Sequence, residues 1–229
     1  MIQLSPRLAA IAALVPKNAR IADVGTDHGY LSVFLAQNAA PRAVIATDIR
    51  PGPLGSAKRH VREAGLEEKI SLRLCNGLEA VFPEEADVIL IAGMGGEVIQ
   101  GILSRAPWAL KGRTLILSPQ SKQETLRRWL YAQNCGIRGE YLVEDSRKIY
   151  PILLVEGTPE REPSPAEFFI GVWPKEKRDG LFLRHLNAQI RRLERERQGL
   201  LCTQDEEKRK KLPELDDLIA GLREMESGE

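Results

Sequence analysis

The sequence predicts an α/β protein with a seven-stranded, mostly parallel sheet, followed by a tail of two antiparallel helices. Two observations carry this prediction. Short runs rich in Val, Ile and Leu alternate with segments of helical period from Ile21 to about Glu156, and further on the apolar residues recur at spacings of three and four. Continuous apolar strands that alternate with helices indicate a sheet covered on both faces. We therefore expect one domain at residues 1–157 and a helical domain at residues 165–229.

Seven apolar runs have the length and composition of strands: Ile21–Val24, Ala43–Thr47, Ile70–Leu74, Val88–Ala92, Thr114–Leu117, Arg138–Val143 and Pro151–Val155. Between the first six lie four segments with helical patterning: Tyr30–Gln37, Leu54–Ala64, Glu97–Arg105 and Gln123–Gln133. The last two runs are too close together for a crossover helix, so we expect an antiparallel hairpin. Seven strands with one reversed at the end are typical of Rossmann-like methyltransferases, whereas dehydrogenases usually keep six parallel strands.

A proline-rich joint after Glu156 separates this pattern from the C-terminal segment. Two stretches there predict amphipathic helices: Leu183, Leu186, Ile190, Leu193 and Leu200, then Leu212, Leu215, Ile219, Leu222 and Met225. The polar stretch Thr203–Lys211 contains the turn, so the helices are expected to fold back as a coiled-coil-like antiparallel pair. A dimerisation element is the alternative role for this tail.

Composition excludes several classes of protein. The chain of 229 residues is 43% hydrophobic and 28% charged, and none of its apolar runs reaches the roughly 18 residues of a membrane span. Its three cysteines, Cys75, Cys135 and Cys202, are far apart, which argues against a disulfide framework and against a metal site. These features predict a cytoplasmic protein with reduced thiols. The net charge of +1 indicates no general basic surface, although residues 1–150 hold 19 Lys/Arg against 15 Asp/Glu.

The strongest local motif runs from Asp23 to Tyr30 and reads Asp-Val-Gly-Thr-Asp-His-Gly-Tyr, at the junction of the first strand and a helix. Gly25 permits a tight turn, and the N–H groups at the helix start can bind a carboxylate or a pyrophosphate. A dinucleotide fingerprint would have its second glycine where this chain has Asp27, whose carboxylate would face the pyrophosphate. A methionine-type ligand carries an ammonium and a sulfonium instead, so the acidic residues favour that ligand.

Three further strand ends carry candidate ligand-binding residues. Asp48 ends the second strand, where a carboxylate can accept both hydroxyls of an adenosine ribose, and capping the next helix is its alternative role. Asn76-Gly77 follows the third strand, where an amide can bind the adenine edge. The block Gly93–Gly96 follows the fourth strand beside the topological switch point, and its glycines indicate close approach of the backbone to a ligand.

Together these residues resemble one family. The segments Ile21–His28, Ala92–Gly96 and Leu4–Leu8 are similar to those of the bacterial tRNA adenine-22 N1-methyltransferases. The resemblance extends over essentially the whole chain, and the Gly-Met-Gly-Gly block stands in place of the Asn-Pro-Pro-Tyr tetrapeptide of many N6-adenine methyltransferases. It implies a class I methyltransferase fold, S-adenosylmethionine as methyl donor and tRNA as acceptor.

The chain departs from that family at two strand ends. It has Cys75-Asn76-Gly77 where relatives often have Gly-Asp-Gly. The Asn76 amide can still hydrogen-bond the adenine, but it is neutral where those relatives have a carboxylate. It has Ser118-Pro119-Gln120 where relatives often have Gln-Pro, which argues against a target-base role for that loop.

Adenine N1 has an in-plane lone pair, so methyl transfer to it needs alignment rather than a base. Asp27 is expected to accept a hydrogen bond from the exocyclic N6, His28 to do the same or take the proton, and Tyr30 to stack on the flipped base. The expected cofactor site comprises Arg7, Asp23, Gly25, Thr26, Gly29, Asp48, Asn76, Gly77, Gly93 and Met94. The expected RNA contacts are Arg59, Arg127, Arg147, Arg191, Arg192 and Arg195, and His60 is a further phosphate candidate.

Several alternatives stay open at this stage. A methyltransferase of the same fold could act on rRNA or a small molecule, because the fold does not define the acceptor. An NAD-binding oxidoreductase is disfavoured by Asp27 and by the reversed last strand. A protein that binds S-adenosylmethionine and RNA without catalysis is the third alternative. The sequence is compatible with a monomer and leaves a dimer open.

Overall fold

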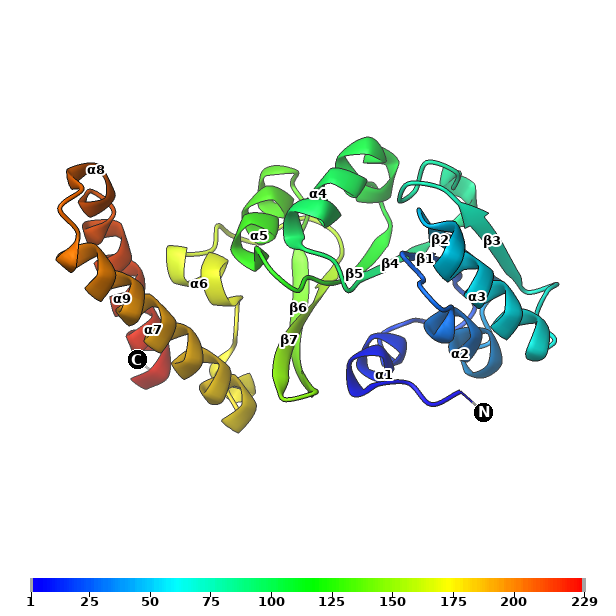
Figure 1. The fold of residues 1–229 in the computed structure, drawn as a ribbon, viewed down its shortest axis with the longest axis horizontal. Coiled ribbons are helices and arrows are strands. Elements are labelled where there is room, and N and C mark those ends of the chain that lie inside the picture. Colours follow the sequence, from blue (N-terminus) through cyan, green and yellow to red (C-terminus); the bar gives the residue numbers. More distant parts are fainter. Residues whose placement is uncertain (1, 228–229) are drawn as a thin grey trace. The chain divides into compact units, whose positions relative to one another are not determined.

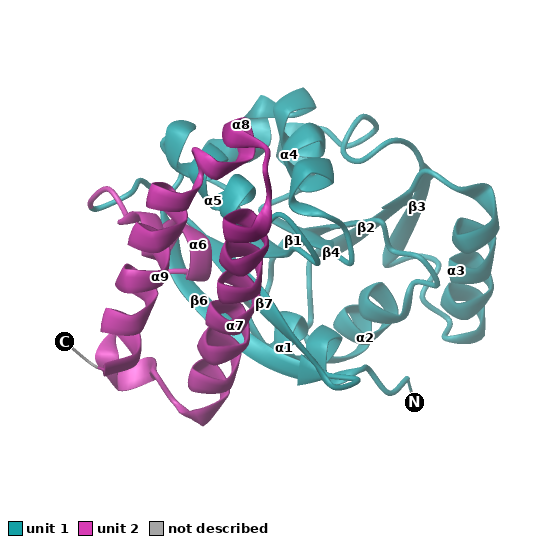
Figure 2. Ribbon diagram, turned by 60° about the vertical axis from the view of Figure 1, so that its left-hand side comes forward, with its two compact units in different colours: residues 1–160 teal, residues 161–229 magenta. Residues whose placement is uncertain are grey.

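The computed structural model describes residues 2–227 and contains a single seven-stranded sheet with helices on both faces (Figure 1). By their internal contacts the residues form two compact units, residues 1–160 and residues 161–229, which Figure 2 shows in different colours. The first unit contains the sheet, and the second is helical. Within the described residues, no helix is long and apolar enough to cross a membrane.

All seven predicted strands are present: β1 (Arg20–Val24), β2 (Ala43–Asp48), β3 (Ile70–Leu74), β4 (Val88–Ala92), β5 (Thr114–Ser118), β6 (Ile137–Asp145) and β7 (Lys148–Val155). Their order in the sheet is β3-β2-β1-β4-β5-β7-β6. The first five strands pair in parallel, and β7 runs antiparallel to both β5 and β6. The predicted antiparallel hairpin is therefore confirmed, and its second strand inserts beside β5.

Helices cover the sheet because successive strand residues face opposite sides. The helices of the first unit are α1 (Pro6–Ala13), α2 (Tyr30–Asn38), α3 (Pro51–Glu63), α4 (Gly96–Arg105) and α5 (Gln123–Ala132). Leu90 of β4 packs with residues of α1, α2 and α3 on one face, whereas its neighbour Ile89 packs with residues of α4 and α5 on the other. Both side chains are fully buried, which explains why the strands read as continuous apolar runs.

The second unit contains α6 (Pro165–Ile170), α7 (Gly180–Cys202), α8 (Glu206–Arg209) and α9 (Leu212–Ser227). Helices α7 and α9 run antiparallel, since Arg197 pairs with Asp216 near one end while the Arg178 guanidinium donates to the Met225 carbonyl at 2.9 Å near the other. The core side chains of the two helices are Phe182, Leu186, Ile190 and Leu193 with Leu215, Ile219, Leu222 and Met225.

Two details of the tail differ from the sequence prediction. Phe182 is fully buried, whereas the predicted core residue Leu183 is 36% exposed, so the apolar stripe of α7 starts one residue earlier. The proline-rich joint contains α6, whose first turn is held by a capping box in which Ser164 and Glu167 exchange hydrogen bonds of 2.8 and 3.2 Å. Pro165 occupies the first helical position, where its missing N–H costs nothing.

Candidate active site

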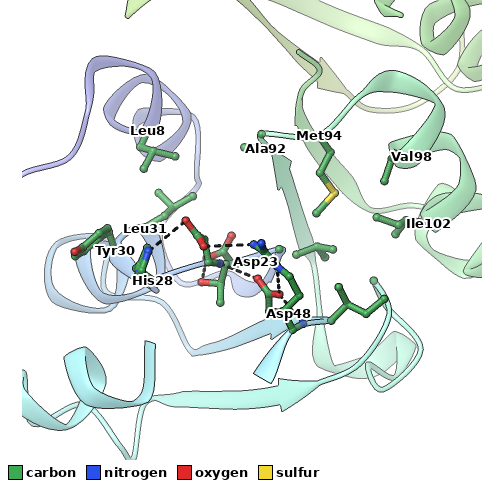
Figure 3. A pocket seen from close by; sticks show the side chains of 18 of the residues that line it. Leu8, Asp23, His28, Tyr30, Leu31, Asp48, Ala92, Met94, Val98 and Ile102 are labelled. Atoms are coloured by element: carbon green, nitrogen blue, oxygen red, sulfur yellow. Dashed lines mark hydrogen bonds and ion pairs between the residues drawn. The ribbon is translucent and has the colours of Figure 1, made fainter. Parts of the chain in front are cut away.

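The carboxyl ends of the central strands open onto a cavity of about 500 Å³ (Figure 3). The cavity lies where β1 and β4 adjoin and the strand order reverses, which is the usual ligand site of an open α/β sheet. Its lining includes all but one of the residues predicted for catalysis and cofactor binding: Arg7, Asp23, Gly25, Thr26, Asp27, His28, Tyr30, Asp48, Asn76, Gly77, Gly93 and Met94. In Figure 3, Asp23 and Asp48 lie between His28 and Tyr30 on one side and Met94 on the other.

Gly29 is the predicted residue that does not line the cavity. It precedes α2 with a φ of +77°, and a Cβ added to it would lie 2.9 Å from the Cβ of Ala57 in α3. Its glycine is therefore explained by a left-handed backbone and by the close packing of α2 on α3.

The turn after β1 is held by a buried carboxylate. Asp23 accepts hydrogen bonds from the Thr26 hydroxyl at 2.7 Å and the Ser32 hydroxyl at 2.6 Å, and burial raises the pKa of Asp23. The N–H groups of Gly25 and Thr26 both donate to the carbonyl of Thr47, at 2.8 and 2.9 Å. A Cβ at Gly25, where φ is +72°, would collide with the side chain of Met94. This turn is therefore rigid and leaves backbone, not side chain, at the cavity wall.

Asp48 joins the second strand to the same turn. Its carboxylate is 5% exposed and accepts the N–H of Asp27 at 3.1 Å and the N–H of Arg50 at 2.9 Å. The alternative role as a helix cap is not what the structure shows, because α3 has Arg50 at its N-cap and no side-chain capping bond. The carboxylate thus organises the loop after β1 and also lines the cavity.

The three predicted catalytic side chains lie together at the cavity. Among the described residues, Asp27 makes two long ion pairs, 3.6 Å to Arg50 and 3.8 Å to the ring of His28, and its side chain is 57% exposed. Tyr30 is 43% exposed and stacks on His60 of α3, with ring centres 4.8 Å apart. His60 Nδ1 donates to the His28 carbonyl at 2.8 Å. Ring stacking and a hydrogen bond thus hold the His60 side chain beside the cavity.

The loops after β4 and β5 close the cavity on the other side. The N–H of Gln120 donates to the Met94 carbonyl at 2.8 Å, and Gln120 lines the cavity. Sequence reasoning missed this residue, since the departure from the family pattern argued against a target-base role for its loop. Its position at the end of a parallel strand was the available signal. A Cβ at Gly96 would lie 2.3 Å from the Lys122 carbonyl, so close packing of the two loops accounts for that glycine.

The prediction that Arg127 contacts RNA is wrong. Arg127 is 3% exposed and pairs with Glu140 of β6, with its Nη2 2.7 Å and its Nε 3.0 Å from the carboxylate oxygens. This buried, hydrogen-bonded ion pair joins α5 to the sheet, so the Arg127 guanidinium is not accessible to a phosphate of RNA. The remaining predicted RNA contacts are exposed: Arg59, Arg147, Arg191, Arg192 and Arg195.

The cavity residues fit S-adenosylmethionine. Within residues 2–227, the Nε and Nη1 atoms of Arg7 are buried without a hydrogen-bond partner, which suits the carboxylate of a methionine group. Asp48 presents a nearly buried carboxylate, which suits ribose hydroxyls, and the acidic residues at the end of β1 suit a ligand that carries an ammonium and a sulfonium. Fold and site together define a class I S-adenosylmethionine-dependent methyltransferase.

Comparisons with known proteins support this class of enzyme and identify a family within it. Residues 4–153 match the family model described as a methyltransferase domain. The chain is 33% identical to the tRNA (adenine(22)-N(1))-methyltransferase of Bacillus subtilis (strain 168) over 98% of this chain and 97% of the relative. This chain therefore belongs to the tRNA (adenine-22-N1)-methyltransferase family.

Solved structures give the same result over the full length. The crystal structure of the B. subtilis m1A22 tRNA methyltransferase superimposes with a TM-score of 0.91 at 31% identity and covers 99% of this chain and 100% of that one. A putative tRNA (m1A22) methyltransferase of Streptococcus pneumoniae, solved in complex with S-adenosyl-L-methionine, gives a TM-score of 0.85 at 31% identity, covering 98% of this chain and 100% of that one. Both likenesses include the helical tail.

Proposed function

We propose that this protein transfers a methyl group from S-adenosylmethionine to N1 of adenine 22 in tRNA. The observation that carries the proposal is its relation to the B. subtilis enzyme, which extends over 98% of the chain and so includes both units. Bound S-adenosylmethionine supplies an electrophilic methyl group on its sulfonium. Since the proposed substrate is tRNA, we expect the protein to act in the cytoplasm.

In this proposal the residues at the strand ends bind the cofactor. Asp48 accepts the ribose hydroxyls, and the Asn76 amide meets the adenine edge. Asn76 accepts a hydrogen bond from Arg105 at 3.2 Å through Oδ1, so its amide is oriented within the cavity lining. The rigid turn at Gly25 lets the backbone approach the methionine end, and the Arg7 guanidinium receives its carboxylate.

Asp27 is the residue we propose to meet the target adenine. Its ion pairs with Arg50 and His28 are long and exposed, so breaking them costs little and a base amine can compete for the carboxylate. As N1 is alkylated, positive charge moves onto the base and the N6 protons become more acidic. A carboxylate placed at N6 therefore stabilises the transition state more than the ground state.

Tyr30 provides a stacking surface for the flipped base. Its ring is partly exposed at the cavity and is backed by His60 on its other side. Stacking on an aromatic ring holds an unpaired base whatever its identity, because every base has a π face. His28 lies beside this pair, with its ring centre 5.8 Å from that of Tyr30, and accepts a proton or hydrogen bond from N6 as the second candidate group.

The tail contributes a few oriented arginines to tRNA binding. Residues 174–229 hold 13 basic and 13 acidic side chains, so a general electrostatic field is absent from that segment. We assign phosphate contacts to the exposed side chains of α7, and Arg192 is held there over the ring of Phe169 at 5.4 Å. Exposed Arg59 on α3 and Arg147, which lies between β6 and β7, are the corresponding candidates in the first unit.

Two variants that each remove positive charge from the tail test the assignment of phosphate contacts to α7. Changing Arg191, Arg192 and Arg195 to glutamine should raise the KM for tRNA and flatten its salt dependence, while leaving cofactor affinity unchanged. The control removes the same charge from the Lys208–Lys211 run, also in the tail, and should have little effect. Equal effects of the two variants would show that only net charge matters, and no effect of the first would refute the assignment.

Methyl transfer to bulk RNA tests the acceptor class. The protein is incubated with labelled S-adenosylmethionine and either total tRNA or total rRNA from cells that lack the modification, and the product nucleosides are separated. We expect label in the tRNA sample alone, as 1-methyladenosine. Label in rRNA, or label on another nucleoside, would favour a different enzyme of the same fold. Absence of label in any RNA while the cofactor binds would favour a non-catalytic protein.

A further inference from the structure

The hairpin formed by β6 and β7 holds the start of α1. Asp145, at the end of β6, accepts the N–H of Arg7 at 3.4 Å and the hydroxyl of Ser146 at 3.0 Å. The Ser5 hydroxyl also donates to this carboxylate, and that bond contributes most to lowering the pKa of Asp145. The carboxylate therefore fixes the first turn of α1 through its backbone and hydroxyl contacts, rather than by a hydrogen bond from the Arg7 guanidinium.

Among the described residues, the Arg7 guanidinium is held by an aromatic ring and by the charge of Asp145 acting through space, not by a hydrogen bond. Its Cζ lies 4.8 Å from the ring centre of Tyr150 in β7. A ring face attracts a guanidinium but does not neutralise it, and the N–H groups in the guanidinium plane stay available for an acceptor. Burial of Arg7 Nε and Nη1 without an acceptor from residues 2–227 carries a free-energy cost that a bound anion would remove. Arg7 also lines the cavity, so its side chain borders the space that such an anion would occupy.

We propose that Tyr150 is a positioning residue which, together with Asp145, holds the Arg7 guanidinium as an oxyanion-binding group of the cavity. The nature of the oxyanion rests on the proposed function, which assigns to Arg7 the carboxylate at the methionine end of the cofactor; a phosphate of the tRNA is the other source, which the test below distinguishes. Both groups accept paired hydrogen bonds from one guanidinium. The hairpin, far in sequence from the loops after β1 and β2, is thereby part of the ligand site.

Two ligands that differ only at the amino-acid end test this assignment. S-adenosylhomocysteine has the carboxylate, and 5′-methylthioadenosine has the same adenosine and a thioether but no carboxylate. Calorimetry of Tyr150→Leu should show binding of S-adenosylhomocysteine weakened about tenfold, with binding of 5′-methylthioadenosine unchanged. Tyr150→Phe keeps the ring and should restore the affinity. Tyr141→Leu removes a partly exposed ring from the same hairpin and serves as the control.

The tRNA arm of the experiment separates the two sources of the oxyanion. If a phosphate is the ligand, Tyr150→Leu leaves the affinity for S-adenosylhomocysteine intact and raises the KM for tRNA about tenfold, with a shallower salt dependence and unchanged kcat. Arg7→Gln should reproduce whichever pattern is found, and it is the variant that decides if Tyr150→Leu does not fold.

Two results would overturn the proposal. Equal weakening of both small ligands would mean that Tyr150 supports only the shape of the cavity. Unchanged ligand affinity together with unchanged KM for tRNA would mean that Arg7 receives no oxyanion. Failure of the proposed function would appear differently, as absent tRNA methylation by the unaltered protein, and would leave the comparison of the two small ligands valid.

Discussion

Replacing Asp48 separates its role toward the ligand from its role in the loop. The carboxylate is nearly buried, accepts the backbone N–H groups of Asp27 and Arg50, and faces the cavity in which we place the ribose. Asp48→Ala removes every one of these contacts. Asp48→Asn keeps the shape and one acceptor oxygen but loses the charge.

The structure sets the size of the expected effect. A hydrogen bond to a charged group contributes about 1.5–3 kcal/mol, which corresponds to a roughly 10- to 150-fold loss of cofactor affinity in Asp48→Ala. The two backbone N–H groups belong to Asp27 and Arg50, which both line the cavity, so water can replace the carboxylate as their acceptor. We therefore expect the free energy of unfolding of the unliganded protein to fall by only about 1 kcal/mol. The affinity of Asp48→Asn for the cofactor should lie between that of the unaltered protein and that of Asp48→Ala.

Calorimetry with S-adenosylhomocysteine measures the affinity, and chemical denaturation without ligand measures the stability. Asp87→Ala is the control, because Asp87 pairs with Arg20 at 2.6 Å outside the cavity and its pKa is lowered to about 2 by that arginine. It should reduce stability and leave affinity unchanged. Unchanged affinity in Asp48→Ala, or equal loss of affinity in Asp87→Ala, would refute the role of Asp48.

Asp27→Ala should lower kcat roughly 100-fold while changing the affinity for S-adenosylhomocysteine little, and equal losses in both would make Asp27 a cofactor residue instead. Tyr30→Ala should raise the KM for tRNA more than Tyr30→Phe does in steady-state assays; equal effects would assign the role to the hydroxyl. Arg127→Met should cost about 3–5 kcal/mol of unfolding free energy, because it leaves Glu140 buried and unpaired. Denaturation of the double variant Arg127→Met/Glu140→Leu should recover most of that loss, and an equally unstable double variant would contradict the pairing.

The fold was predictable because its constraints are local in the sequence. Adjacent residues such as Ile89 and Leu90 are buried on opposite faces of the sheet, and a short run of such residues rich in Val and Ile is typical of a strand in a covered sheet. The insertion of β7 between β5 and β6 was not predictable, since strand order depends on pairings between distant segments. The short helix α6 was missed although Ser164 and Glu167 have the spacing of a capping box, because the surrounding prolines indicated only a joint.

The site was predictable wherever its residues follow parallel strands, because the carboxyl ends of those strands meet at one edge. Asp23, Asp48 and Asn76 are of this kind, and all three line the cavity. Arg127 was mispredicted because its partner Glu140 lies on a different element, and charge alone does not distinguish a buried pair from a surface arginine. Tyr150 carried no local signal, since it reaches the site only through its contact with Arg7.

The most direct test of the proposed activity uses two tRNA transcripts that are identical except for adenine or guanine at position 22. Each is incubated with the protein and labelled S-adenosylmethionine, and the products are digested to nucleosides. We predict incorporation that approaches one methyl group per molecule of the adenine-22 transcript, recovered entirely as 1-methyladenosine, and none in the guanine-22 transcript. Equal labelling of the two transcripts, or recovery of the label as another methylated nucleoside, would contradict the assignment of this chain's activity to N1 of adenine 22.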